Sequence, residues 1–113
     1  MEKEPKTLRK IQPPTLTIEL EHPIVMKGTE ETIYTEIELR EPNLDQITSF
    51  VKKVGKENPL DCMRWLISEL SGIPRLALGQ LKAREYYKAQ TYLTFFLEPP
   101  DEDDPEGNVA GSR

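Results

Sequence analysis

The chain has 113 residues, of which 36% are hydrophobic and 31% are charged, and its formal net charge is −5 at pH 7. This length suits one compact domain. The acidic balance, with no clustered basic surface, argues against a protein that binds nucleic acids through their phosphates.

The two ends of the chain are rich in proline, glycine and charge. Residues 1–14 and 98–113 hold too few apolar side chains to offset the entropy of ordering them. We therefore predict a flexible N-terminal segment, a single domain over residues 15–97, and a disordered acidic tail over residues 98–113.

Alternating apolar and polar residues predict two strands within residues 15–40. In the first strand, Leu16, Ile18 and Leu20 alternate with polar residues. Pro23 predicts an edge, a bend or a bulge there, because proline donates no ladder hydrogen bond. The second strand is expected to place three residues on each face. Ile33, Ile37 and Leu39 would point to one face, and Tyr34, Glu36 and Glu38 to the opposite face. Together the strands predict an antiparallel hairpin with one wet face.

Helices are predicted over residues 43–97, where they would cover the apolar face of the hairpin. Asn43 is a good N-cap for the first helix, and Gln46 completes a capping box. Its apolar face is expected to consist of Leu44, Ile47, Val51 and Val54, with Phe50 beside it. Gly55 marks its end.

The second helix is predicted to begin with Asn58 as its cap and Pro59 in its first turn, and to end at Gly72. Its apolar stripe would be Leu60, Met63, Leu66, Ile67 and Leu70. A short helical turn follows Pro74. A last long helix would carry a stripe of Tyr86, Ala89, Leu93, Phe96 and Leu97. The order of elements predicts an α+β fold, an N-terminal antiparallel hairpin packed on three to four helices.

Residues suited to catalysis or metal binding are scarce. His22 is the one histidine, and nothing in the sequence marks a partner for it. Cys62 is the one cysteine, and its apolar neighbours predict a small buried thiol. We therefore expect no enzyme activity, no metal site and no cofactor. With no signal peptide and no apolar run long enough for a membrane helix, we expect a soluble, intracellular protein.

Aromatic residues lie in unexpected places on the predicted helices and strands. Tyr87 and Phe95 point away from the stripe of the last helix, and Trp65 lies off the main face of the second helix. Tyr34 lies on the wet face of the hairpin. Two interpretations stay open. Several elements wrap these rings in a thin core, or the rings form a surface that binds a partner.

The order of these features resembles the phage tail assembly chaperone family, short proteins of Mu-like and P2-like contractile-tailed phages. The first half of the resemblance rests on Pro23, Gly28 and the run Leu39-Arg40-Glu41-Pro42. The second half rests on a set of break and helix residues, namely Gly72, Pro74, Leu81, Tyr86, Phe96 and Leu97. Lys82 departs from the pattern, since a short acidic or polar residue is the more usual cap there.

The resemblance implies a scaffold that acts in the cytoplasm of the host cell during virion assembly. Such proteins bind the tape-measure protein, help tail tube subunits to assemble, and are absent from the finished virion. It implies no catalytic residues. Two alternatives stay open, a small structural component retained in a phage complex and a nucleic-acid-binding regulator, which the acidic charge disfavours. The sequence does not define the oligomeric state.

Overall fold

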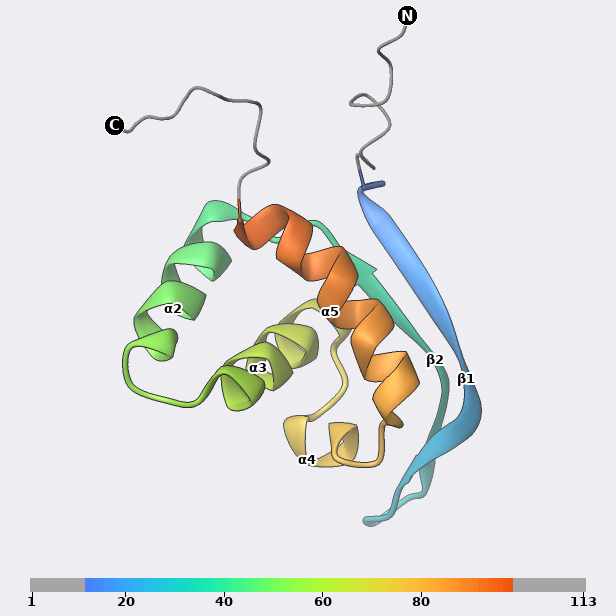
Figure 1. Ribbon diagram of the computed structural model, residues 1–113. Helices are drawn as coiled ribbons and strands as arrows, with labels where there is room; N and C mark the ends of the chain where they lie inside the picture. The colour runs from blue at the N-terminus through green and yellow to red at the C-terminus, as the bar shows by residue number, and fades with distance from the viewer. Residues whose placement is uncertain (1–11, 99–113) are drawn as a thin grey trace, which may run out of the picture.

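The computed structural model describes residues 12–98 of the chain. The elements, in chain order, are β1 (Thr15–Met26), β2 (Thr32–Arg40), α2 (Leu44–Val54), α3 (Pro59–Ser71), α4 (Arg75–Leu78) and α5 (Ala83–Leu97). The predicted α+β fold, a hairpin followed by helices, is confirmed (Figure 1). Of the predicted end segments, residues 1–11 and 99–113 lie outside the described part.

The hairpin is a long curved ribbon that runs along one side of the helices (Figure 1). Its strands pair antiparallel from Thr15↔Arg40 to Glu19↔Glu36, and again from Ile24↔Tyr34 to Met26↔Thr32. Between these two stretches, residues 20–23 of β1 stand opposite Thr35 alone. Pro23 lies in this bulge, as its missing N–H predicted, and bulges of this kind bend and twist a strand pair.

The bulge changes which residues of β2 face the helices. Ile37 and Leu39 are buried as predicted, but Ile33 is exposed, so its predicted orientation is wrong. Tyr34 packs against the core instead, because beyond the bulge it pairs with the buried Ile24. The prediction assumed that apolar residues of β2 alternate regularly along a straight strand. The extra residues of β1 at the bulge twist the strand pair, so that the inward face of β2 changes from odd-numbered to even-numbered residues.

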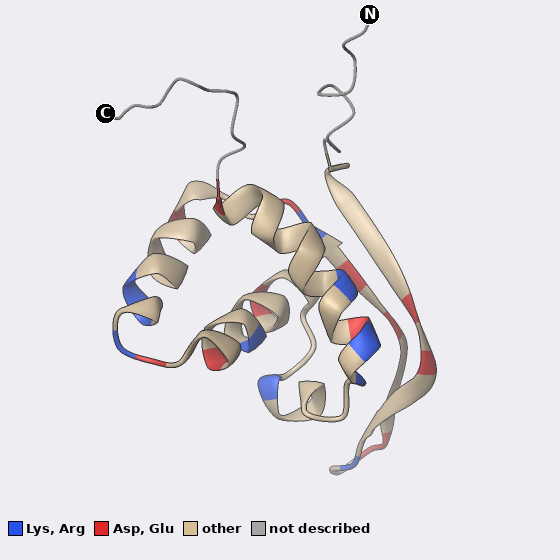
Figure 2. Ribbon diagram, viewed as in Figure 1, with Lys and Arg blue, Asp and Glu red and all other residues tan. Residues whose placement is uncertain are grey.

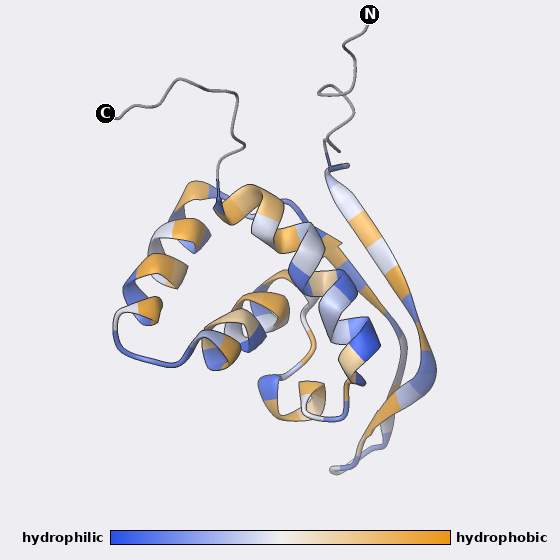
Figure 3. Ribbon diagram, viewed as in Figure 1, coloured by the Kyte–Doolittle hydropathy of each residue, from blue (hydrophilic) through white to orange (hydrophobic). Residues whose placement is uncertain are grey.

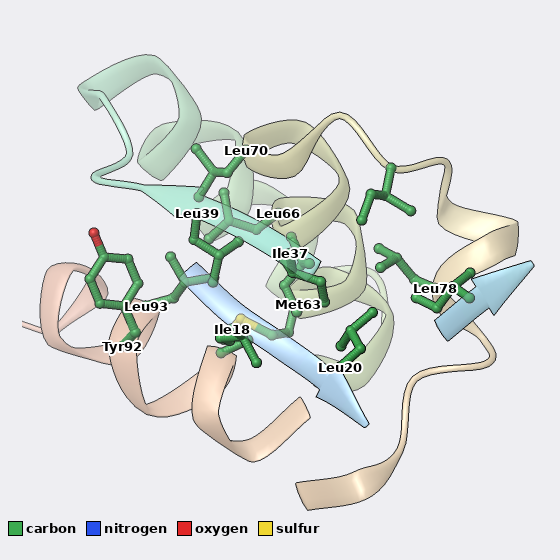
Figure 4. Packing of buried hydrophobic residues seen from close by; sticks show 14 of the residues in the cluster. Ile18, Leu20, Ile37, Leu39, Met63, Leu66, Leu70, Leu78, Tyr92 and Leu93 are labelled. Carbon is green, nitrogen blue, oxygen red and sulfur yellow. The ribbon is translucent and has the colours of Figure 1, made fainter. Parts of the chain in front are cut away.

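The core lies between the hairpin, α3 and α5 (Figure 4). It contains Ile18, Leu20, Ile24, Ile37 and Leu39 from the strands, Met63, Leu66, Ile67 and Leu70 from α3, and Ile73, Ala77, Leu78, Ala89, Tyr92 and Leu93 from the later segments. Most of the stripes predicted for α3 and α5 are thus in the core or packed against it. Leu60 is the exception in α3, and Tyr92 is a core residue that the predicted stripe of α5 omitted.

Local sequence signals place the helix ends. The side chain of Asn43 accepts from the N–H of Gln46 at 2.9 Å, and the side chain of Gln46 accepts from the N–H of Asn43 at 3.0 Å, so the predicted capping box is present. Asn58 caps α3 in the same way. Gly72 ends α3 with φ of 81°, a left-handed conformation that favours glycine. Lys82 precedes α5 without a side-chain cap.

Two side chains, Glu85 of α5 and Gln80 of the turn after α4, bind the outer edge of β1 near its bulge. The N–H of Glu21 donates to Oε2 of Glu85 at 2.8 Å. The side chain of Gln80 accepts from the N–H of Val25 at 3.0 Å and donates to its carbonyl at 2.7 Å. These hydrogen bonds satisfy backbone groups of β1 that have no partner strand on this side. They also fix the position of the α4–α5 region along the hairpin.

Candidate functional site

The groups with reactive chemistry are dispersed or buried. His22 is exposed in the bulge, and Cys62 is fully buried on α3. Burial, with Glu57 nearby, raises the pKa of the Cys62 thiol, which keeps it protonated. Among residues 12–98, no three His, Cys, Asp or Glu side chains gather as a metal site would require. Across the same residues, every helix falls short of the length and hydrophobicity that a membrane crossing requires.

Glu85 is a buried carboxylate, and its contacts give it a structural role. Its Oε2 accepts the N–H of Glu21, which the bulge of β1 leaves without a strand partner. Its Oε1 has no hydrogen-bond partner among the described residues. Glu85 therefore positions the first turn of α5 against β1.

Exposed apolar side chains are the more informative feature. The large ones are Ile33, Leu44, Val51, Val54, Leu60, Leu76 and Tyr87. Four of them, Val51, Val54, Leu60 and Tyr87, line two neighbouring hollows between the helices. We call these two hollows together the apolar trough. Its concentration of uncovered apolar surface is typical of a protein interaction site.

The first hollow lies between the beginning of α3, α4 and the beginning of α5, and has a volume of about 470 Å³. Leu60, Leu81, Tyr86 and Tyr87 give it an apolar wall, and Arg64 adds a charged group. Arg64 is fixed by donating to the carbonyl of Arg75 at 2.8 Å. This part of the trough therefore combines aromatic surface with a polar rim, as interface pockets commonly do.

The second hollow lies between α2, the beginning of α3 and α5, and has a volume of about 380 Å³. It is lined mainly by apolar residues, among them Phe50, Val51, Val54, Met63 and Leu97. Leu60 and Tyr86 line both hollows, which makes the trough continuous. The pKa of Tyr86 is raised by burial and by the neighbouring Tyr87, so its phenol stays neutral.

Helix α2 forms the wall of the second hollow and is incompletely covered. Its contacts are chiefly with α3, and Figure 3 shows its apolar bands on a helix that stands apart from the hairpin. None of its residues is buried by the described part of the chain. The predicted apolar face exists, but Leu44 is 76% exposed and Val51 is also exposed, so α2 contributes little to the cover that the helices together give the hairpin.

Of the four aromatic residues predicted to bind a partner, the structure places one in the trough. Tyr87 is 58% exposed and stacks edge to face on Tyr86 at 5.5 Å between ring centres. Phe95 is half-buried against Phe96 at 5.2 Å, and Trp65 is half-buried with the Lys53 ammonium 5.0 Å from its ring centre. Tyr34 is half-buried on the hairpin, so the four rings form no common patch.

Leu60, Val51 and Val54 are trough residues that the sequence analysis placed on apolar helix stripes without identifying them as exposed. One feature of the sequence does indicate that some of these stripe residues stay exposed. Three apolar helix stripes compete for one apolar face of a two-stranded hairpin, which is too narrow to cover them all. The spacing of apolar residues identifies the stripes but not which of them the fold leaves open.

A third hollow of about 540 Å³ separates α5 from β1 and has a more charged lining. Its lining includes the charged residues Glu19, Arg84 and Lys88, together with Tyr87. Acidic residues follow the outside of the hairpin, whereas basic residues gather on α5 and at the end of α2 (Figure 2). The apolar trough is therefore the more distinctive surface for binding an apolar partner.

Comparison with known proteins identifies the family of this chain. Residues 17–98 match the profile of a family described as phage tail assembly chaperone proteins, E, or 41 or 14. The search of curated proteins and the search of solved structures found no match. The matched residues run from the first strand to the end of α5 and include both hollows of the trough. The chain belongs to the phage tail assembly chaperone family.

Proposed function

We propose that this chaperone binds the tape-measure protein through the apolar trough, promotes assembly of the tail tube around it, and leaves before the virion is finished. The observation that carries the proposal is the gathering of Val51, Val54, Leu60 and Tyr87 around one continuous trough. These side chains would cost free energy if left in water throughout the life of the protein.

The form of the trough favours a helical segment as the bound element. Residues of α2, α3 and α5 line its second hollow, and a hollow bounded by three helices can accept the apolar face of an amphipathic helix. A tape-measure protein is a long helical chain whose apolar surface would aggregate before the tube encloses it. Covering that surface in the host cell would keep the chain available for assembly.

Two exposed leucines, one inside the trough and one outside it, allow a controlled test of the proposed binding site. Leu60 is 64% exposed inside the trough, and Leu76 is 79% exposed outside it. In pull-downs with the co-expressed tape-measure protein of the same phage, Leu60→Ser and Tyr87→Ala should each weaken binding by about fivefold or more. Leu76→Ser should bind like the unmodified chain.

Circular dichroism and thermal melting would verify that the three variants are folded. Equal binding by Leu60→Ser and Leu76→Ser would contradict the trough as the site. In that case Phe95, Trp65 and Tyr34, the other predicted partner contacts, become the next residues to substitute. A chain that never binds the tape-measure protein would contradict the function itself.

The proposed departure from the tail requires a separate measurement. Mass spectrometry of purified particles should detect tube and tape-measure peptides and no peptides of this chain. A stoichiometric amount of the chain in finished particles would favour the alternative, a structural component retained in the tail.

A further inference from the structure

Helix α5 lies along the outer edge of β1, and hydrogen bonds join the two elements on either side of the third hollow. The Tyr92 hydroxyl donates to the carbonyl of Pro13 at 2.8 Å, and Glu85 accepts the N–H of Glu21 at 2.8 Å. The third hollow, of about 540 Å³, lies between these contacts. Among the described residues, only Tyr87 lines both this hollow and the apolar trough.

The α5 wall of the third hollow is basic, although the domain around it is acidic. Residues 12–98 contain ten basic and thirteen acidic residues, a net charge of −3. The exposed charged residues of α5 are Arg84 and Lys88, and both line the hollow, whereas the acidic residue of this helix, Glu85, is buried. Glu19 is the one carboxylate among the described lining residues. The hollow therefore has a positive charge on a negative domain, which favours an acidic occupant (Figure 2).

The third hollow also offers backbone groups and aromatic surface. The N–H of Glu41 donates to the carbonyl of Pro14 at 2.8 Å, which fixes the phase of the strand ladder. Because ladder bonds alternate along an antiparallel pair, Thr17 and Glu19 direct their backbone N–H and C=O groups away from β2. Tyr87 adds a ring that is 58% exposed. An extended chain can use both features, since strand edges bond to its backbone and aromatic grooves accept proline rings.

The chain has an acidic, proline-containing segment directly after α5. This segment, residues 99–113, lies outside the described part. Its sequence contains one basic residue, three prolines and five acidic residues, namely Asp101, Glu102, Asp103, Asp104 and Glu106. Residues 1–11, which precede Gln12 at the third hollow, contain four basic and two acidic residues, so they have the wrong charge for it. The C-terminal segment has the charge and the prolines that the hollow favours.

The C-terminal segment is long enough to reach the third hollow. Lys88 and Arg84 lie ten and fourteen residues before Glu98, so they are about 15 Å and about 21 Å back along the helix at about 1.5 Å per residue. An extended chain covers up to about 3.4 Å per residue, which lets Asp104 lie up to about 20 Å from Glu98 and Glu106 up to about 27 Å. The acidic residues can therefore meet both basic side chains if the segment turns back along α5.

We propose that the acidic C-terminal segment, residues 99–113, occupies the third hollow of its own chain, with its carboxylates near Arg84 and Lys88. Exposed ion pairs are individually weak, but the covalent link raises the local concentration of the segment to about the millimolar range. The occupancy is therefore partial and sensitive to salt. Because Tyr87 also lines the trough, the segment competes there with the tape-measure protein, and this competition rests on the proposed function.

Paramagnetic broadening of amide signals in the full chain tests where the segment lies. A spin label on Asn108→Cys, in a Cys62→Ala background, should broaden the signals of Thr17 and Thr91, which line the third hollow. About 1 M salt should remove the broadening, because the screening length falls to about 3 Å. A mixture of labelled chain and isotope-enriched unlabelled chain would identify any broadening between molecules. Absence of intramolecular broadening at Thr17 and Thr91 would overturn the proposal.

Charge reversals distinguish the third hollow from the other basic region, at the end of α2. Arg84→Glu combined with Lys88→Glu should abolish the broadening at the hollow. Lys52→Glu combined with Lys56→Glu makes the same change in net charge and should preserve it. Circular dichroism would verify that both double variants are folded. Broadening that survives the α5 reversal, or that is lost in the α2 reversal, would contradict the proposed site.

Binding to the tape-measure protein tests the competition at Tyr87. A variant whose five acidic segment residues are replaced by the corresponding amides should bind about threefold more tightly, as expected if the segment covers the ring about two-thirds of the time. Glu30→Gln combined with Glu31→Gln, at the exposed hairpin turn, should leave the affinity unchanged. Equal affinity of the amide variant and the unmodified chain would overturn the competition. The broadening experiment needs no partner, so it decides the position of the segment even if no variant binds the tape-measure protein.

Discussion

Helices α2 and α3 have similar lengths, eleven and thirteen residues, and each begins after an asparagine whose side chain caps the helix. Both carry an apolar stripe, and both have an aspartate in the first turn. Yet α3 buries five residues, whereas the described part of the chain buries none of those in α2. Capping and periodicity thus determine that a segment is helical, and its position relative to the hairpin determines what its stripe contacts.

The difference separates two kinds of apolar surface in one small protein. The stripe of α3 fills the space beneath β2 and holds the fold together. The stripe of α2 lies at the rim of the molecule and is available to another chain. Three comparisons between the helices, ordered by the size of the expected effect, would test this division.

The largest contrast is expected from the same truncation on each helix. Leu66 in α3 is 0% exposed, so Leu66→Ala should remove packing and leave a cavity, lowering the free energy of unfolding by about 2–5 kcal/mol. Leu44→Ala in α2 should change it by less than about 0.5 kcal/mol. Chemical denaturation of dilute protein would measure both. Comparable losses would show that α2 belongs to the cooperative core.

The cap residues should give a smaller contrast. Asn58→Ala removes the acceptor for the N–H of Asp61, and Asn43→Ala removes the acceptor for the N–H of Gln46. Each loss costs about 1 kcal/mol locally. For Asn58 we expect a lower melting temperature of the whole domain, because α3 is in the core. For Asn43 we expect faster amide exchange in α2 with little change in global melting.

The smallest effect is a difference in how stability depends on pH. Burial raises the pKa of Cys62 in the folded protein, so folding favours the neutral thiol. Its contribution is complete below the unfolded pKa of about 8.5 and is lost as pH rises through the folded pKa. Between pH 7 and 9.5, the unmodified chain should lose more stability than Cys62→Ala. Parallel curves for the two proteins would show that the thiol is accessible to water.

The sequence was sufficient for the order of elements because each boundary has a local physical cause. The asparagine caps of α2 and α3, the proline bulge and the glycine at the end of α3 depend on residues that are close in the chain. The inward face of β2 could not be predicted, because Ile33 and Tyr34 exchange roles through a bulge in the other strand. Pairing across strands decides this orientation, and the alternation within one strand does not report it.

The candidate site was less predictable for a related reason. Tyr87 was identified as an exposed ring because it lies off the stripe of its own helix. Leu60 and Val51 belong to good stripes, and only the competition among three helices for one narrow hairpin leaves them open. Exposure of such residues depends on the whole tertiary arrangement, so a periodic pattern assigns them to the core.

The contacts between the two ends of the domain bear on how the protein is made. The Tyr92 hydroxyl donates to the carbonyl of Pro13 at 2.8 Å, and Leu93 lies in the core beside the strands. The hairpin is synthesised first, but its apolar face is completed by the last helix. Contacts between residues so distant in sequence slow folding, because a long loop must close before they form. A nascent chain that lacks α5 would expose Ile18, Ile37 and Leu39, so folding must wait until nearly all of the domain has left the ribosome.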